Sequence, residues 1–138
     1  MQPIPRAGAQ GGPGSLYQRV GGEDGVRRLV EAFYDLVETH PAGAPVNLLQ
    51  LRGHGVAHAR IDQFKFLSGF FGGPKLYAET YGHSNVRQIH AHVEIDAAAK
   101  DSWLTCMDMA LDQVGLETAL KREIMASFTV ISEKLVNK

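Results

Sequence analysis

The histidine at position 90 is the residue of this sequence best suited to metal chemistry. His90 ends a short turn-forming segment, and the only tryptophan, Trp103, follows it by thirteen residues. A neutral imidazole nitrogen can bind a transition metal, and a large aromatic side chain can cover the face of a flat ligand. The pair indicates a site that could hold a flat metal-containing cofactor by one axial ligand. The alternative is a partly buried histidine that only satisfies a hydrogen bond.

The other histidines are weaker candidates for metal binding. His54 and His58 are four residues apart, which on a helix puts both side chains on one face, as in two-histidine zinc sites. No carboxylate or third histidine follows at a suitable interval, so zinc is the less favoured interpretation. His92 lies two residues from His90, and side chains at that spacing diverge on a helix, so the two compete for one role. Apolar residues one and four positions earlier favour His90.

The composition is that of one ordinary globular domain. The chain has 138 residues, 44% hydrophobic and 21% charged, with a formal net charge of −1. Without a basic excess we expect no nucleic-acid partner, and without a long apolar run no membrane span. A single cysteine, Cys106, excludes an internal disulfide and a multi-cysteine metal site and is typical of a reducing, cytoplasmic setting. Residues 1–14, rich in glycine and proline, are expected to form a flexible tail before one domain at 15–138.

The spacing of apolar residues predicts an all-α fold. Residues that recur at three- and four-residue steps indicate helices over 23–39, about 56–71, 75–80, 96–114 and about 116–135. The prolines and glycines between 41 and 55 predict a loop. Ser84 is expected to cap a brief turn that ends near His90. No segment has a convincing strand pattern or an internal repeat.

Two polar residues occupy positions that the helical pattern assigns to the interior. Gln63 shares a stripe with Phe66, and Tyr34 shares one with Val30. A buried amide or phenol without a partner costs about 1 to 3 kcal/mol, so each must meet a hydrogen-bonding group. Both could face one cavity that holds a polar ligand. Each by itself is more simply explained by a bond to another protein group, within an ordinary helical bundle.

Several motifs stand together in an order that resembles a known family. They are Gly72-Gly73-Pro74, Tyr77, Gly82-His83, Arg87, His90-Ala91 and Asp101-Ser102-Trp103-Leu104-Thr105-Cys106-Met107, preceded by Leu16-Tyr17, Gly21-Gly22 and Phe33-Tyr34. From Leu16 to Asn137 the chain resembles the second group of truncated haemoglobins, the two-over-two globins of bacteria and plants. The resemblance implies a truncated globin fold, a two-over-two helical sandwich around haem b.

The resemblance implies a role for each matched residue. His90 becomes the proximal ligand of the haem iron, while Tyr34 and Trp103 become hydrogen-bond donors to a bound diatomic molecule. Gln63 stands where the family usually has an aliphatic residue, so a third donor is expected on this distal side. Haem contacts are expected from Phe33, Leu51, Phe66, Leu67, Phe70, Tyr77, Val86, Arg87, Ile95 and Met107, with Tyr77 and Arg87 meeting the propionates. A distal wall is expected from Arg52, His54, His58 and Ala59.

The chain departs from the family's pattern in three places. Ile89 stands where a basic residue often precedes the proximal histidine, and Val93 replaces the usual aromatic residue after it. The loop predicted over 41–55 is longer than is typical. Three residues compete for the aromatic position expected near its end: Leu51, Arg52 and His54.

The implied functions fall into two classes. Several donors aimed at one ligand stabilise the negative charge that develops when dioxygen binds ferrous haem, which indicates binding of dioxygen, carbon monoxide or nitric oxide for transport or storage. Slow release would instead suit an enzyme of nitric oxide dioxygenation or peroxidase-like chemistry. Such an enzyme needs a separate reductase, because the chain has no flavin or nicotinamide motif. A haem-free helical interaction module is the third possibility, and a monomer or homodimer is expected at this size.

Overall fold

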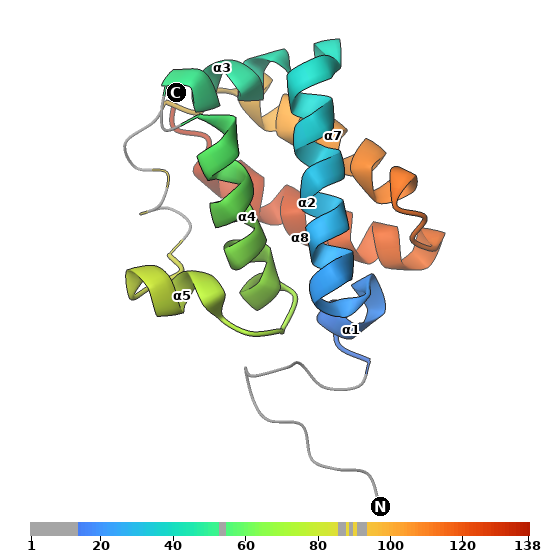
Figure 1. Ribbon diagram of the computed structural model, residues 1–138. Helices are drawn as coiled ribbons and strands as arrows, with labels where there is room; N and C mark the ends of the chain where they lie inside the picture. The colour runs from blue at the N-terminus through green and yellow to red at the C-terminus, as the bar shows by residue number, and fades with distance from the viewer. Residues whose placement is uncertain (1–13, 53–54, 86–87, 89, 91–93) are drawn as a thin grey trace, which may run out of the picture.

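Helices make up every element that is described in the computed structural model, which covers residues 14–52, 55–85, 88, 90 and 94–138 (Figure 1). They are α1 (Leu16–Val20), α2 (Gly22–Thr39), the 3₁₀ turn η1 (Pro41–Gly43), α3 (Ala44–Arg52), α4 (Val56–Phe70), α5 (Leu76–Tyr81), α7 (Ala97–Gln113) and α8 (Thr118–Leu135). The predicted all-α class is confirmed. The expected flexible tail lies almost wholly outside the described residues. None of the described helices is long and apolar enough to span a membrane.

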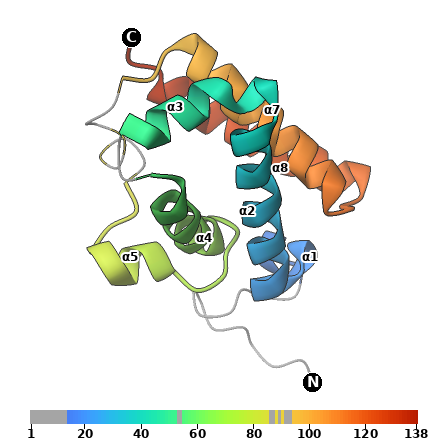
Figure 2. The same cartoon turned by 45° about the horizontal axis from the view of Figure 1, so that its top comes forward.

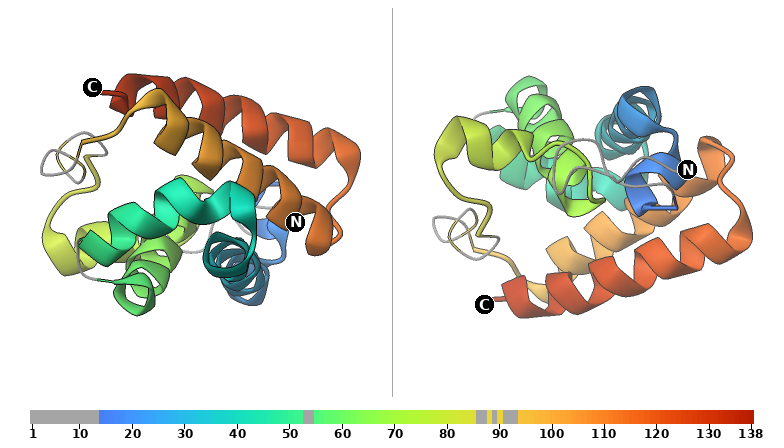
Figure 3. Two further views of the ribbon diagram at one scale, coloured as in Figure 1. Left: turned by 90° about the horizontal axis from the view of Figure 1, so that it is seen from above. Right: turned by 90° about the horizontal axis from the view of Figure 1, so that it is seen from below.

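The long helices form two pairs that are stacked as two layers. Helix α2 packs against α4, and α7 packs against α8. Figure 1 shows the α2 and α4 pair in front of α7 and α8, and Figure 3 shows the same two layers from above and below. Helix α3 crosses one end of the layers and contacts α2, α4 and α7, while α5 packs against α4 at the edge (Figure 2). This arrangement is the expected two-over-two sandwich.

The closed part of the core lies where α2 meets α7 and α8. Its fully buried side chains include Val26, Leu29, Phe33, Met107, Leu111 and Ile124. Burial of each such side chain contributes roughly 1.5–3 kcal/mol. Glu23 and Asp24 occupy the first turn of α2, where negative charge is favourable next to the helix dipole. The stripe predicted over 23–39 therefore forms a helix with the expected buried face.

The segment predicted as a loop over 41–55 is mostly helical, so that prediction was wrong. Pro41 is the first residue of η1, and the ring Nδ1 of His40 accepts a 3.0 Å hydrogen bond from the Ala42 N–H. Pro45 is the second residue of α3. A proline in the first turn of a helix loses no intrahelical hydrogen bond, so both prolines begin helices here instead of preventing them. The resulting helix α3 supplies one wall of the site described below.

Side-chain caps hold the chain on both sides of His90. The Oδ1 of Asn85 accepts a 3.0 Å hydrogen bond from the Gln88 N–H, so Asn85, and not the predicted Ser84, caps the turn before His90. The helix predicted from residue 96 begins one residue later as α7, and Asp96 caps it, because its Oδ1 accepts a 2.8 Å hydrogen bond from the Ala99 N–H. Gln88 and His90 are both helical.

Candidate functional site

A cavity of about 390 Å³ lies between the two helix layers. Helices α2, α3, α4, α5, α7 and α8 all contribute to it, together with His90 and Ile95. Its apolar lining consists of Val46, Leu49, Ala59, Phe66, Leu67, Phe70, Ile95, Ala99, Phe128, Ile131 and Leu135. A cavity of roughly 300–1,000 Å³ with such walls and a few polar groups is typical of a site for a small molecule or cofactor.

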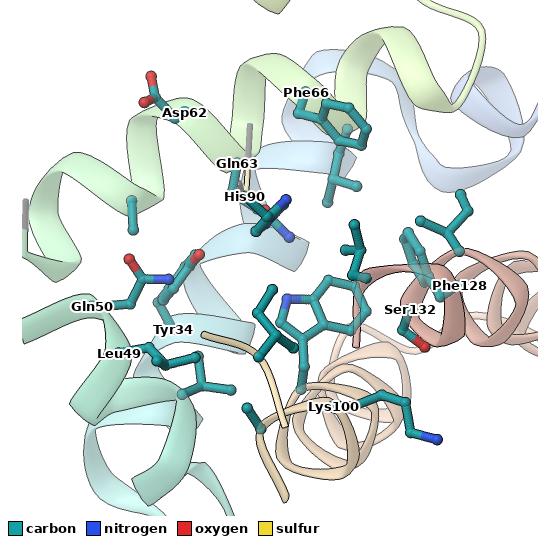
Figure 4. Close-up of a pocket in the computed structure, with 18 of the residues that line it drawn as sticks. Tyr34, Leu49, Gln50, Asp62, Gln63, Phe66, His90, Lys100, Phe128 and Ser132 are labelled. Atoms are coloured by element: carbon teal, nitrogen blue, oxygen red, sulfur yellow. The ribbon is translucent and has the colours of Figure 1, made fainter. Parts of the chain in front are cut away.

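The four residues on which the sequence analysis rested all line this one cavity. His90 comes from the turn before α7, Tyr34 from α2, Gln63 from α4 and Trp103 from α7. Figure 4 shows Tyr34, Gln63 and His90 directed into the same space from separate elements. The fold brings the His90 imidazole and these three hydrogen-bonding side chains together in an apolar cavity, because Tyr34 and Trp103 are 69 positions apart in the sequence.

Tyr34 is held as a buried phenol. Its side chain is 3% exposed, and its ring packs edge-on against Phe33 with 4.8 Å between centroids. Burial raises the pKa of the Tyr34 phenol well above its usual range; the positive charge of Arg60 opposes the shift and Asp62 adds to it. Tyr34 therefore keeps its proton at neutral and moderately alkaline pH and remains able to donate a hydrogen bond.

Aromatic packing holds Trp103 in the wall of the cavity. Its ring lies 5.2 Å from that of Phe33 and 4.9 Å, nearly perpendicular, from that of Phe128. Offset and edge-on pairs of this kind contribute about 0.5–1.5 kcal/mol each beyond the burial of area. They restrict the indole to one orientation. A hydrogen-bond donor at this position is therefore preorganised.

Two predicted haem contacts lie behind the cavity wall instead of on it. Phe33 and Met107 are both fully buried and are not among the residues that line the cavity. Phe33 precedes Tyr34 on α2, and adjacent residues on a helix point in different directions, so Tyr34 faces the cavity and Phe33 the closed core. Met107 lies one turn beyond Trp103, where α7 enters that core. Both support the residues that face the cavity.

Helix α3 presents different residues to the cavity from those expected. Leu51 is 66% exposed and does not line it, whereas Leu49 and Gln50 do. Figure 4 shows Gln50 extending from α3 into the space that Tyr34 also faces. Gln50 was not predicted as a site residue, because a segment expected to be a loop has no helical register that would place its side chains. His54 and the side chain of Arg52 lie outside the described residues.

Helices α4 and α5 form a polar rim on one side of the cavity. The Tyr81 hydroxyl donates a 2.8 Å hydrogen bond to Asp62 Oδ1, and His58 Nε2 lies 2.9 Å from Asp62 Oδ2. Tyr77 packs on Tyr81 with 4.5 Å between ring centroids. All four residues line the cavity. Tyr77 was predicted as a haem contact and His58 as part of the distal wall, whereas Asp62 and Tyr81 were not predicted.

This rim also changes the acid–base properties of its two phenols. The pKa of Tyr81 is raised mainly by its hydrogen bond to Asp62, and partial burial adds to the shift. Burial, and then the charge of Asp62, raise the pKa of Tyr77. Both phenols therefore stay neutral at physiological pH and are able to donate a hydrogen bond, as Tyr81 does to Asp62. Val86 and Arg87, which were also predicted as haem contacts, lie outside the described residues.

The possible metal ligands around the cavity suit a flat metal-containing cofactor better than a bare metal ion. Among residues 14–52, 55–85, 88, 90 and 94–138, no three His, Cys, Asp or Glu side chains are grouped so that they could hold a metal ion. His58, one half of the possible zinc pair, is next to Asp62. Two imidazoles, of His58 and His90, line the cavity, and His58 is the one that lies beside Asp62. The His90 imidazole in a large cavity with aromatic walls matches haem, which needs one protein ligand and apolar surface on its faces.

A two-over-two helical sandwich around an apolar cavity, with a histidine before α7 that lines it, is the arrangement of the truncated globins. The family model described as Bacterial-like globin matches residues 15–137, so the chain belongs to that family. Within it the chain is a group II truncated haemoglobin.

Relatives from bacteria agree with this assignment. A group 2 truncated haemoglobin of Bacillus subtilis is 32% identical over 117 residues, which is 85% of either chain. A solved group II 2-on-2 haemoglobin from the plant pathogen Agrobacterium tumefaciens is similar with a TM-score of 0.84 and 29% identity, covering 91% of this chain and 95% of that one. The structure of a truncated oxygen-avid haemoglobin from Bacillus subtilis has a TM-score of 0.76 and 31% identity, covering 89% of this chain and 99% of that one.

Proposed function

We propose that this protein binds haem b through His90 and binds dioxygen, and other diatomic gases, at the haem iron. The observation that carries the proposal is the meeting of His90 with Tyr34, Gln63 and Trp103 in one apolar cavity. Haem supplies an iron that binds a diatomic molecule. The residues of the chain then determine how the cofactor is held and how strongly the bound molecule is stabilised.

Each residue has a distinct part in this proposal. The His90 imidazole supplies the one protein ligand to iron. Phe66, Leu67, Phe70 and Phe128 offer apolar surface to the faces and edges of the macrocycle. The Tyr34 phenol, the Gln63 amide and the Trp103 indole are donors for the negative charge that a bound dioxygen acquires. Tyr77 is a donor for a propionate.

Slow release of dioxygen follows from several donors that act on one ligand. A relative of this chain is described as oxygen-avid. A protein that retains dioxygen is poorly suited to delivery, so the same site also supports a second proposal. In that proposal the bound dioxygen is consumed by nitric oxide dioxygenation, or peroxide is reduced, and a separate reductase restores the ferrous iron.

Absorption spectra of the ferric, ferrous and carbonyl-bound protein, recorded beside His90→Gly, test the proposal. We expect haem bands in the wild type and altered bands in the variant. A colourless protein, or a variant with unchanged bands, would refute it. Gln63→Leu should speed dioxygen release, measured by stopped flow, and an unchanged rate would remove Gln63 from the distal site. Nitrate formed in a single turnover with nitric oxide would favour the enzymatic alternative.

A further inference from the structure

Two opposed hydrogen bonds join Asn137, which follows α8, to Ile95, which precedes α7. The Ile95 N–H donates to Asn137 Oδ1 at 2.7 Å, and the Asn137 N–H donates to the Ile95 carbonyl oxygen at 2.9 Å. Both backbone polar groups of Ile95 are thus bound by one residue that is 42 positions away in sequence. A two-point contact of this kind restrains both the distance and the relative rotation of the two segments.

Ile95 lies where such a restraint reaches the candidate site. Its side chain is 8% exposed and lines the cavity together with His90, five residues earlier. The next residue, Asp96, caps α7. The Ile95 backbone is therefore held from one side by the start of α7 and from the other by Asn137.

The same wall continues onto α8. Ile131, Ser132 and Leu135 line the cavity, and Asn137 follows Leu135 by two residues. The contact between Asn137 and Ile95 therefore joins the α8 wall of the cavity to Ile95. Lys138 forms an exposed ion pair with Glu94 beside this contact, with 2.6 Å between Nζ and Oε2.

We propose that Asn137 is a positioning residue for His90. By fixing the backbone at Ile95 it restricts the orientation that the His90 imidazole presents to the haem iron, and this inference rests on the proposed function, in which His90 is the proximal ligand. Groups that orient a metal-bound histidine determine the strength and geometry of the bond to the metal. A ligand whose supporting contacts are lost samples several orientations, and its bond to iron weakens on average.

Replacement of the Asn137 acceptor tests this role. Asn137→Ala removes the oxygen that binds the Ile95 N–H, whereas Asn137→Asp keeps an acceptor oxygen at the same place. Asn137→Ser is a second variant that keeps a polar side chain, but the serine is too short to reach the Ile95 N–H. In the haem-loaded protein we would measure the iron–histidine stretching band by resonance Raman, the rate of haem loss and the exchange of the Ile95 amide hydrogen.

We expect Asn137→Ala and Asn137→Ser to shift or broaden the iron–histidine band, to speed exchange at Ile95 and to release haem about tenfold faster, as the loss of one part-buried hydrogen bond implies. Asn137→Asp should resemble the wild type. Lys138→Ala is the matched control: it removes the neighbouring exposed ion pair, leaves both bonds to Ile95 and should change none of the three measurements.

An iron–histidine band and a haem-loss rate that are unchanged in both the Ala and Ser variants would overturn the inference. An Asp variant as impaired as the Ala variant would overturn it as well, because the acceptor oxygen would then not be the relevant group. If His90→Gly alters the haem bands while the Asn137 variants behave as wild type, the proposed function stands and only the positioning role fails. Unchanged haem bands in His90→Gly would refute both.

Discussion

Arg60 of α4 lies over the ring of Tyr34 of α2, with its guanidinium carbon 5.9 Å from the ring centroid. The same guanidinium binds three carboxylates of α2: Glu31, Asp35 at 2.9 Å and Glu38 at 2.5 Å. The Arg60 side chain is only 20% exposed. One residue thus joins the two helices that carry Gln63 and Tyr34 and covers the outer side of the Tyr34 ring.

Arg60→Met should destabilise the protein, because it removes the cation that offsets the repulsion among three carboxylates on α2. The carboxylates are partly exposed, so we expect a loss of about 1–2 kcal/mol in the free energy of unfolding, measured by urea denaturation. Arg19→Met, which breaks a single exposed ion pair with Glu123, is the control and should lose about 0.5 kcal/mol or less. Equal losses in the two variants would argue against a special role for Arg60.

Tyr34→Phe should release dioxygen faster, by about tenfold or more, because it removes a buried donor. Since burial raises the Tyr34 pKa, the phenol should remain a donor as the pH rises past its ordinary pKa of about 10. Dioxygen release from the wild type, followed by stopped flow between neutral and alkaline pH, should therefore stay constant until the protein unfolds. A release rate that rises near the ordinary tyrosine pKa would contradict this.

The raised pKa of the Tyr34 phenol also makes the free energy of unfolding depend on pH. A phenol whose pKa is higher in the folded state contributes stability that is fully present below the unfolded pKa, about 10, and is lost as the pH rises through the folded pKa. The difference in free energy of unfolding between wild type and Tyr34→Phe should therefore shrink, or change sign, above about pH 10. Denaturation curves at a series of alkaline pH values check this, and a difference that is independent of pH would refute it.

Gln50→Leu should also speed dioxygen release, since Gln50 faces the same space as Tyr34. The loss of one donor implies an effect of up to about tenfold. Leu51→Ala changes the next residue of α3, which faces solvent, and should leave the rate unchanged. The opposite result, with Leu51 sensitive and Gln50 silent, would mean that α3 has a different register.

Tyr81→Phe should speed the loss of haem by removing the hydrogen bond that ties α5 to α4 beside the cavity. Tyr81 is 42% exposed, so the effect should be small, about two- to fivefold. Transfer of haem to a scavenging apoglobin measures it. Thr80→Ala, which removes the neighbouring hydrogen bond from Lys65 to Thr80 on the outer face, is the control.

The sequence by itself determined the helices whose apolar stripes are strong. The pattern over 23–39 predicted α2 to within a residue at its start, because one face of that helix must be buried whatever its partner is. The start of α7 was also predicted to within a residue, and the signal is local because the Asp96 side chain binds a backbone group three residues away. The choice of His90, Tyr34, Gln63 and Trp103 depended on the family resemblance and on polar residues in apolar stripes.

Only the tertiary structure decided which of two neighbouring residues on a helix faces the cavity. Gln50 lines it and Leu51 does not, and Tyr34 lines it while Phe33 supports it. In each pair the two residues follow one another on the same helix. The way α2 and α3 pack therefore decides which of the two side chains faces the cavity. The contacts of Asp62 with Tyr81 and of Asn137 with Ile95 join separate segments. No local pattern encodes such contacts, because they exist only once the layers are packed together.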